Sequence, residues 1–599
     1  MTLSPANDDS PLLPPPTRLP QLLVLLVVLV VYVRVLFNPF VIFDDHIFLY
    51  MNPNLVPPGI HTLEHYWNPR NDSYGLYVPL TYTFWWIAAE VGYDAGLNQL
   101  SPVPFKLLSW FTHGLTAVLV YRLARKILFR STGRPHQAIC MFTAILWACH
   151  PMQVESVAWA SGYKDLLAGF GVFLTLNVFF ARGVAPRPFS ATAMIAAALG
   201  FIAMLGKPSA MTVPALALML SVMLWRVPFR QALLSTLPMF ILCGSLALLA
   251  KAVQQNEYVV SVPYWMRPLA ALDALAWYTY TFVVPVALAP DHARNPFNIL
   301  RDGAIYWTWV LPVVLWYLAY RLRQRAPLLS VTAWWVPLGV GPVLGFVSFQ
   351  YQNYTTVAEH YFYVSNFGLC LAVAAGLAQL PNVAPHLSRW RVPAGLVLLV
   401  LASIGTVRQL GYWRETEPLF LRAVEVAPRS ALSLNNLGAL YGRRALAANE
   451  KGNKREADRL FLVANDYMEK TVQAAPRYSA FWSSLVITRI NIGNLNGAID
   501  AATRMLEAAK LENKRNQQRS APTAAVVGRI LLKANRLEEA KTALEFSIAH
   551  GGIGDDPMAK ETADPEADLA EVLRRLAAAS TQPTTQPLPA PPSNPASPG

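Results

Sequence analysis

The sequence predicts an all-α protein in which a polytopic bundle of membrane-spanning helices precedes a soluble α-solenoid. Hydrophobic residues make up 54% of the 599 residues, and charged residues make up only 14%. Apolar runs long enough to cross a bilayer recur through the first two thirds of the chain. The last third is polar and carries a helical repeat pattern. The length and this change in composition favour more than one folded domain.

Four segments follow from this change in composition. Residues 1–18 are rich in proline and are predicted to form a disordered tail. Residues 19–411 form the membrane domain, and residues 412–550 form the repeat domain. Residues 551–599 hold one further helix, over 561–580, and then a Pro-rich disordered tail. The net charge of +13 lies largely in short loops between apolar runs, which indicates membrane topology rather than nucleic-acid binding.

The first apolar run, from Leu19 to Phe37, follows Arg18 and lacks a small-residue cleavage site, so we expect an uncleaved membrane anchor. Two apolar segments, 76–96 and 271–289, are ambiguous, because each borders long polar or Pro-rich loops and is compatible with a re-entrant or surface helix. Ten further runs bring the predicted number of spans to about eleven. They are 105–127, 137–151, 165–181, 189–205, 209–225, 231–251, 304–320, 329–348, 364–380 and 391–410.

Positive charges give the predicted orientation, because short loops rich in Arg and Lys stay in the cytoplasm. Five loops between the apolar runs are basic. They fall on one side of the membrane only if neither 76–96 nor 271–289 crosses it. The opposite, exoplasmic face then collects the other polar loops and the repeat domain, which indicates a site on that face. The basic loops carry Arg122, Arg125, Lys126, Arg130, Arg134, Arg182, Arg187, Arg226, Arg230, Arg321, Arg323, Arg325, Arg389 and Arg391.

Two adjacent carboxylates, Asp44 and Asp45, follow the first span. Carboxylates at a membrane exit are costly unless they stay hydrated or bind a cation. They are the candidate catalytic residues and, if a divalent metal ion takes part, its candidate ligands. The alternative is an ordinary turn, because Asn38-Pro39 lies nearby and aspartate favours turns.

A second polar stretch runs from His150 to Asp165. Ionisable groups at a membrane boundary usually line a cavity or pair with each other. His150, Glu155 and Asp165 are therefore candidate site residues, and Lys164 is a candidate phosphate ligand. The alternatives are an interfacial histidine at 150 and a helix cap at 164–165, where an acidic residue suits the helix dipole.

Two short elements complete the candidate site. Lys207, in Gly206-Lys207-Pro208, is placed to meet a lipid phosphate; alternatively, its side chain extends along apolar surface to the interface. At the start of a later span, His360 is a candidate phosphate ligand, and Glu359 and Tyr361 are further site candidates. Aromatic residues at such a position also form ordinary interfacial belts.

A family resemblance rests on five blocks that occur in order before the repeats. They are Phe43-Asp44-Asp45, His-Pro-x-x-Val-Glu-Ser-Val-Ala-Trp at 150–159, Lys164-Asp165-Leu-Leu, Gly-Lys-Pro at 206–208 and Glu-His-Tyr-Phe-Tyr at 359–363. With these blocks, the chain resembles the transmembrane and tetratricopeptide repeat-containing proteins, O-mannosyltransferase-like members of the GT-C glycosyltransferase superfamily, and especially their bacterial relatives. The resemblance covers roughly residues 19–550.

The resemblance implies a GT-C-like membrane glycosyltransferase with a polyprenyl-phosphate-linked sugar as donor. It implies Asp44 and Asp45 as the catalytic pair, and a protein or peptide acceptor presented by the repeats. The implied location is the bacterial inner membrane with periplasmic repeats, or the endoplasmic reticulum membrane with lumenal repeats in a eukaryote. A divalent metal ion is compatible with the acidic pair but is not required by it.

Two departures from the family pattern bear on activity. Relatives carry Arg where this chain has Tyr163 and His360, and arginine binds phosphate bidentately while keeping its charge. An alternative function is therefore a catalytically degenerate, membrane-anchored scaffold for envelope proteins. A second alternative is a transporter or flippase for a lipid-linked sugar, which the scarcity of ionisable residues midway in the spans disfavours.

The region from Pro418 shows the tetratricopeptide pattern, in which stacked helix pairs form a concave binding surface. An insertion over 443–458 separates the two parts of the first complete repeat. The alternative interpretation of this region is an ordinary helical bundle. The residues that fit the pattern are Phe420, Ala423 and Pro428 in an incomplete leading repeat, then Leu434, Leu437, Gly438, Tyr441, Ala464, Met468 and Pro476, then Trp482, Leu485, Gly493 and Ala498, and finally Ala524, Gly528, Ala540 and Leu544.

Overall fold

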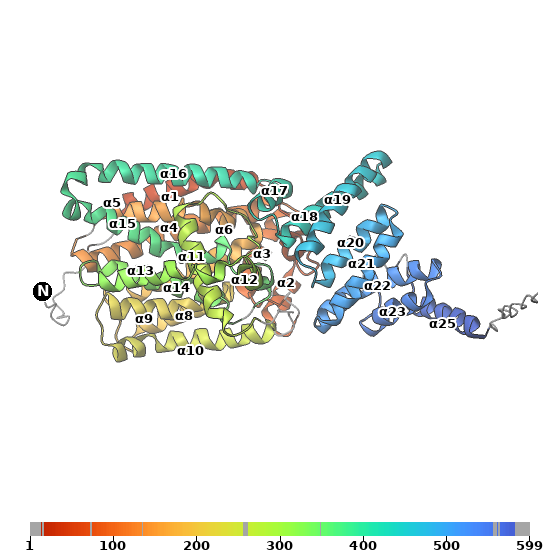
Figure 1. Ribbon diagram of the computed structural model, residues 1–599. Helices are drawn as coiled ribbons and strands as arrows, with labels where there is room; N and C mark the ends of the chain where they lie inside the picture. Colours follow the sequence, from red (N-terminus) through yellow and green to blue (C-terminus); the bar gives the residue numbers. More distant parts are fainter. Residues whose placement is uncertain are drawn as a thin grey trace, which may run out of the picture. The chain divides into compact units, whose positions relative to one another are not determined.

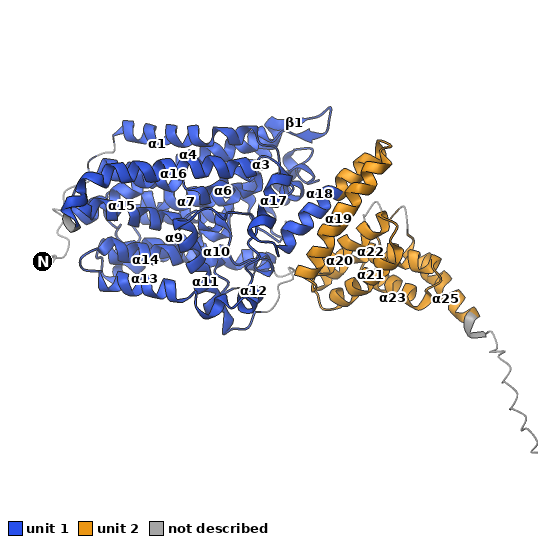
Figure 2. Cartoon of the chain, turned by 45° about the horizontal axis from the view of Figure 1, so that its top comes forward, with its two compact units in different colours: residues 1–441 blue, residues 442–599 orange. Residues whose placement is uncertain are grey.

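The structure, a computed structural model, consists of two compact units, residues 1–441 and 442–599 (Figure 2). The boundary between these units lies inside helix α18 (Ala431–Glu450), and the predicted domain limits stay a prediction. The predicted disordered tails lie almost wholly outside the described residues. The structure describes residues 14, 17–71, 75–134, 136–254, 262–347, 349–554, 560 and 563–581.

The described residues confirm an all-α protein. Their strands are β1 (Tyr93–Asp94) and β2 (Gln99–Leu100), which pair as a short antiparallel hairpin. The long helices of the first unit lie alongside one another (Figure 1). These helices are α1 (Arg18–Tyr32), α3 (Pro79–Gly92), α4 (Val103–Thr132), α5 (Gln137–Ala148), α7 (Tyr163–Phe179), α8 (Ala191–Gly206), α9 (Val213–Met223), α10 (Phe229–Val253), α11 (Met266–Val283), α13 (Val310–Arg321), α14 (Pro327–Val340), α15 (Asn366–Val383) and α16 (Arg391–Tyr412).

Within the described residues, four helical segments have the length and apolar composition to cross a membrane: Arg18–Phe37, Val103–Thr132, Phe229–Val253 and Pro385–Tyr412. Each other predicted span also contains a helix, but a shorter one or one less apolar. The predicted count of eleven spans is therefore not confirmed. A helix rises about 1.5 Å per residue, so a helix of 14 residues, such as α3, covers about 21 Å.

Short helices form the polar loops of the first unit. They contain many of the residues of interest and lie between the long helices along the chain. They are η1 (Val33–Phe37), η2 (His46–Tyr50), α2 (Ile60–Trp67), η3 (Pro151–Gln153), α6 (Val154–Ala158), η4 (Ala160–Gly162), η5 (Pro208–Thr212), α12 (Pro296–Arg301), η7 (Ala304–Tyr306), η8 (Gly341–Val343), η9 (Gln350–Asn353), η10 (Glu359–Phe362), η11 (Pro385–Trp390) and α17 (Thr416–Val426).

Several of the basic loops meet at one end of the bundle. The Arg130 side chain donates to the Trp225 carbonyl over 3.5 Å, and the Trp225 indole donates to the Gly183 carbonyl over 2.6 Å. Nearby, the Lys126 ammonium donates to the carbonyl of Asn177 over 2.6 Å. These contacts join the loops that follow α4, α7 and α9, three of the five predicted to be cytoplasmic. We call this the basic end of the first unit.

Other loops meet away from the basic end. The Trp159 indole donates to the Phe43 carbonyl over 2.6 Å, which ties the loop after α1 to the segment before α7. Thr81 donates to the Gly206 carbonyl over 2.7 Å, which ties the start of α3 to the end of α8. We call this the site end, because these loops carry the Asp44-Asp45, Lys164-Asp165 and Lys207 elements. Which compartment each end faces stays a prediction.

Small residues let two helices near the site approach closely. A Cβ atom added to Gly171 on α7 would lie only 2.4 Å from the Cβ of Ala203 on α8. A Cβ atom at Gly169 would lie 2.4 Å from the ring of Tyr363. Close backbone approach through small residues is a common way for membrane helices to associate. The packing places the first turn of α7, with Lys164 and Asp165, beside the end of α8.

The second unit is built from consecutive helices that pack on one another: α19 (Lys454–Ala474), α20 (Ser479–Asn491), α21 (Leu495–Lys510), α22 (Lys514–Lys533), α23 (Leu537–Ala549) and α25 (Pro565–Thr581). Asn453, Asn494 and Asn513 cap the helices that follow them, each accepting a backbone N–H three residues on. A Cβ atom at Gly528 would lie 2.5 Å from Leu544, so α22 and α23 pack closely. The tetratricopeptide assignment stays a prediction.

Candidate functional site

The two adjacent aspartates after α1 differ in conformation and surroundings. Asp44 has a φ of 65°, in the left-handed region that residues other than glycine rarely adopt, whereas Asp45 has a φ of −59°. The next residues form η2, a π-helical turn, and such turns are frequent at functional sites. The backbone conformation therefore differs between the two adjacent aspartates.

Asp45 is a buried structural anchor. One carboxylate oxygen accepts the Ser161 backbone N–H over 2.9 Å and the Ser161 hydroxyl over 2.6 Å. The other accepts the Val41 N–H over 3.1 Å. Fully buried Lys106, whose ammonium donates to the Ala158 carbonyl over 2.5 Å, interacts with it electrostatically. Asp45 thus fixes the first loop to the start of α7, and neither of its oxygens is free.

Asp44 is half-buried, and within the described residues its carboxylate takes part in no hydrogen bond or ion pair. Burial raises the pKa of Asp44 above its ordinary value of 3.8, while Lys164 and His360 act in the opposite direction. A carboxylate with free oxygens and a raised pKa has the properties of a general base.

The two lysines of the site are held differently. The Lys164 ammonium lies 4.8 Å from the centre of the Phe48 ring and 4.7 Å from that of Trp159. No carboxylate of the described residues lies within ion-pair distance of it. Lys207 instead lies 2.6 Å from an Asp165 oxygen, and its ammonium is 5.3 Å from the Tyr361 ring centre. Of these two lysines, Lys164 is therefore the one that no described carboxylate compensates at ion-pair distance.

His360 lies among aromatic rings and against a buried carboxylate. Its ring centroid is 5.5 Å from that of Trp159 and 4.3 Å from that of Tyr361. Its Nδ1 lies 3.0 Å from a Glu155 oxygen, and its backbone N–H donates to the other Glu155 oxygen over 2.8 Å. Glu155 therefore holds both the backbone and the ring of His360.

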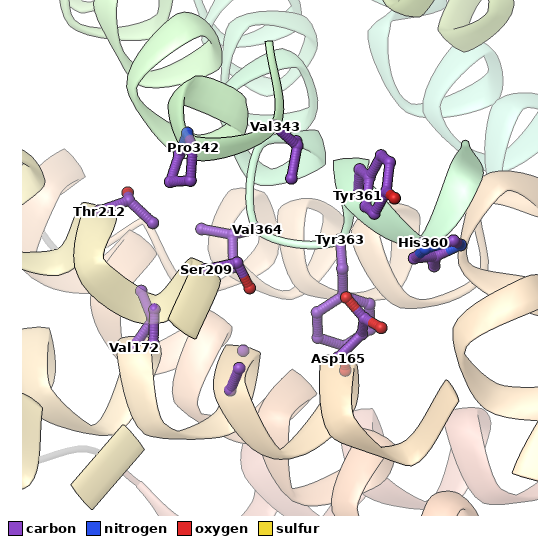
Figure 3. A pocket seen from close by; sticks show the side chains of 14 residues that line it. Asp165, Val172, Ser209, Thr212, Pro342, Val343, His360, Tyr361, Tyr363 and Val364 are labelled. Atoms are coloured by element: carbon purple, nitrogen blue, oxygen red, sulfur yellow. The ribbon is translucent and has the colours of Figure 1, made fainter. Parts of the chain in front are cut away.

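A small cavity of about 20 Å³ lies beside these residues, and Figure 3 shows its lining. This is room for about one water molecule. Polar atoms reach it from Asp165, Ser209, His360 and Tyr361, while Val172, Pro342, Val343 and Val364 supply an apolar side. The cavity thus places an apolar surface next to the Asp165–Lys207 pair.

Most of the sequence-predicted site residues lie together at the site end. Asp44, Glu155, Lys164, Asp165, Lys207, Glu359, His360 and Tyr361 are linked by the contacts above or interact electrostatically with one another. His150 is not among them. Its Nε2 lies 3.0 Å from the Phe282 carbonyl, and its ring stacks on Phe282 at 4.6 Å. These contacts fit the alternative interpretation of His150, an interfacial histidine whose hydrogen bonding is satisfied by its neighbours.

Sequence reasoning missed three residues of the site. Lys106 lies in the first turn of α4. In the sequence, a lysine at the start of an apolar run is typical of an interfacial residue. Tyr351 has its ring centroid 6.4 Å from that of His360. His292 has its Nε2 2.8 Å from a Glu359 oxygen. The polar Asp291-His292-Ala-Arg294 stretch was the available signal for His292. The sequence did not show that its partner is Glu359, which lies 67 positions away.

The donor set does not favour a metal centre. No group of three or more His, Cys, Asp or Glu side chains in the described part of the chain could hold a metal ion. Asp45 already uses both oxygens, so Asp44 alone of the predicted pair offers free ones. We therefore derive no step through a metal ion.

No protein-family model and no curated protein matches this chain. A functional assignment accordingly rests on the residues of the site and their geometry.

Proposed function

We propose that the chain is a membrane glycosyltransferase that moves a sugar from a polyprenyl-phosphate donor to an exoplasmic hydroxyl acceptor. The observation that supports the proposal is that two opposite charges at the site end, the Asp44 carboxylate and the Lys164 ammonium, interact electrostatically and have no ion-pair partner among the described residues. Each of these residues has the chemistry that one half of such a transfer needs.

Lys164 suits the donor side of the reaction. A sugar leaves a polyprenyl phosphate as the bond from the anomeric carbon to the phosphate oxygen breaks, which leaves extra negative charge on the phosphate. A positioned cation stabilises that charge. In this proposal Lys164 supplies the positive charge beside the donor phosphate, since the neighbouring Tyr163 is buried and carries no charge.

Asp44 suits the acceptor side. Its carboxylate takes the proton of the acceptor hydroxyl while the hydroxyl oxygen bonds to the anomeric carbon. Asp45 holds the loop through Ser161 and takes no part in the proton transfer. The unequal roles follow from their unequal hydrogen bonding, since only one of the two has free oxygens.

The helices of the second unit suit the binding of a protein or peptide acceptor, since stacked helix pairs form extended binding surfaces. In this proposal the site end and the second unit face the periplasm, or the lumen in a eukaryote. The lipid bilayer surrounds the apolar helices.

One observation favours a scaffold without catalysis. Lys207 is paired with Asp165 and His360 with Glu155, so two of the three cations expected to bind phosphate are already compensated. A scaffold of this kind would bind its partners but transfer no sugar.

The decisive experiment measures transfer from a radiolabelled polyprenyl-phosphate hexose in membranes that contain the wild type, Asp44→Asn or Lys164→Gln. We expect labelled protein with the wild type only. Asp302→Asn is the matched control, because this carboxylate is half exposed and lies outside the site. Equal transfer by wild type and Asp44→Asn contradicts the role of Asp44. No transfer from any donor, with partners still bound by Asp44→Asn, favours the scaffold.

A further inference from the structure

Helix α17 (Thr416–Val426) follows α16 along the chain and belongs to the first unit (Figure 2). Its buried residues recur at helical spacing, so one face of the helix packs against the rest of the unit. These residues are Thr416, Leu419, Phe420 and Ala423. Leu421, by contrast, is 44% exposed. The helix therefore has a covered face and a free face.

The segment that leads to Asp44 is bound by α17 and the turn before it. The Ile42 backbone N–H donates to the Thr416 hydroxyl oxygen over 3.0 Å. The side-chain amide of Asn38 donates to the Trp413 carbonyl over 3.3 Å. These partners lie 374 and 375 positions apart in the sequence. Two long-range hydrogen bonds thus fix the path of the loop on the N-terminal side of Asp44.

The residue directly before Asp44, Phe43, has its ring among three other aromatic rings. Its centroid lies 4.8 Å from that of Trp159, 6.0 Å from that of Phe420 and 6.4 Å from that of Trp413. All four side chains are buried. Edge-on and tilted arrangements at these distances are favourable for aromatic pairs. Phe43 is therefore packed between the segment before α7 and the residues of and before α17.

The backbone of Asp44 needs this support. Its φ of 65° lies in the left-handed region, which residues with a side chain rarely adopt. Such a conformation persists where the surrounding structure holds it. On one side Ile42 and Phe43 are bound as described, and on the other side the Asp45 carboxylate is bound by Ser161. The fold thus fixes the residues on both sides of Asp44.

Helix α17 is itself fixed by a second loop of the first unit. The Arg422 guanidinium donates to the Val286 carbonyl. The hydroxyl of Ser430, four residues after the end of the helix, donates to the carboxylate of Asp291, and both side chains are buried. These contacts tie α17 to the loop over 286–291, so the helix is a supported element against which the Asp44 loop rests.

We propose that Thr416 and Phe420 are positioning residues that, through Ile42 and Phe43, hold Asp44 in the conformation in which its carboxylate meets the acceptor hydroxyl. This role rests on the proposed function, in which Asp44 is the general base. Thr416 and Phe420 touch neither donor nor acceptor and act only through the two residues before Asp44. The polar segment that follows the apolar helices is thereby part of the site.

Transfer kinetics of the full-length protein in membranes, with a radiolabelled polyprenyl-phosphate hexose as donor, test the role of Thr416. Thr416→Val keeps the shape of the side chain but removes the oxygen that accepts the Ile42 N–H, whereas Thr416→Ser keeps that oxygen. Because a small displacement of a reacting group slows the chemical step, we expect Thr416→Val to lower kcat about 10-fold with an unchanged KM for the donor. Thr416→Ser should restore most of kcat. Wild-type kcat in Thr416→Val, or an equal loss in both variants, overturns the role of Thr416.

Cysteine labelling tests the position of the loop without turnover. Asp44→Cys places a thiol at a half-buried position, while the four native cysteines are buried. We expect a maleimide to label this thiol about 5-fold faster when Phe420→Leu or Thr416→Val is added, because the loop then opens more often. Leu421→Ala, at the exposed position next to Phe420, is the matched control and should leave the rate unchanged. Equal rates with and without Phe420→Leu and Thr416→Val overturn the proposal, and so does faster labelling that extends to the native cysteines, because it reports general unfolding.

The two measurements separate this inference from the proposed function. If the wild type transfers no sugar, the proposed function fails, while the labelling rates still decide whether Thr416 and Phe420 hold position 44. If the wild type is active and neither kcat nor the labelling rate changes in the variants, the proposed function stands and the positioning role fails.

Discussion

At the residue scale, identical side chains have different roles because their neighbours differ. Asp45 is bound by Ser161 and Val41, while Asp44, one position earlier, has free oxygens. Lys207 is compensated by Asp165, while Lys164 lies over two aromatic rings. In each pair, the proposed function uses the member that lacks a hydrogen-bond or ion-pair partner among the described residues.

Removing the Asp45 carboxylate should lower the stability of the folded protein and not only its activity. Asp45→Ala leaves Lys106 buried without its compensating charge and leaves the Ser161 N–H without an acceptor. Leaving a buried polar group without its hydrogen-bond partner costs about 1–3 kcal/mol. We expect a clearly lower melting temperature for Asp45→Ala and a near-normal one for Asp44→Ala, measured by thermal unfolding in detergent. Equal melting temperatures would contradict the anchoring role.

The raised pKa values of Glu155 and Glu359 predict a pH-dependent stability. The folded protein holds a proton up to about pH 7, whereas an ordinary glutamate releases it near 4.5. Stabilisation from these groups is therefore complete below the ordinary value and is lost as the pH rises through about 7. His292, with its pKa lowered by burial to about 4, is neutral in both states above its ordinary 6.5.

The measurement is the melting temperature on either side of pH 7, at values above 6.5. We expect the wild type to lose stability as the pH rises and Glu359→Gln to lose less, because glutamine cannot ionise. A steeper loss in the variant than in the wild type would contradict the assigned pKa direction.

At the scale of the elements, the site depends on helices that approach closely. The first turn of α7 carries Lys164 and Asp165, and its position beside α8 relies on Gly171 facing Ala203. The tight contact at Gly169 places Tyr363 in the same region, and the Tyr363 hydroxyl lies 2.9 Å from Nδ1 of His113. Side chains added here push the helices apart and displace the site.

Gly171→Ala should destabilise the first unit by about 1–3 kcal/mol, since overpacking costs that much in a filled interior. Gly376→Ala on α15 is the matched control, because the space around its added Cβ is open. There, alanine should be neutral or stabilising by about 0.5–1 kcal/mol through helix propensity. Thermal unfolding of both variants measures the difference, and the reverse order would contradict the close approach of α7 and α8.

At the scale of the whole molecule, the first unit has ends of different chemistry. Three basic loops meet at one end and the candidate site lies away from it. By the rule that basic loops stay in the cytoplasm, we predict that the site faces the exoplasmic side.

Cysteine labelling in intact cells tests this orientation. The four native cysteines are buried, so they give little background. A membrane-impermeant thiol reagent should label Glu64→Cys, at the site end, without permeabilisation, and should label Arg134→Cys only after it. The opposite pattern would contradict both the orientation and the exoplasmic acceptor.

Sequence patterns predicted the helical class and the positions of the helices, because apolar periodicity and length act locally. They also singled out most of the residues that lie together at the site end, since ionisable groups between apolar runs are conspicuous. They did not give the number of spans. Composition alone does not decide whether a helix as short as the 14-residue α3 crosses the membrane.

The sequence by itself determined an all-α chain with apolar helices, a polar second unit and a set of charged residues gathered in particular loops. Only the tertiary structure decided which of those charges have partners. Glu155 and His360 lie 205 positions apart, and His292 meets Glu359 across 67. The pairing of distant side chains depends on how helices pack, and that packing also sets the burial that shifts the pKa values of the glutamates.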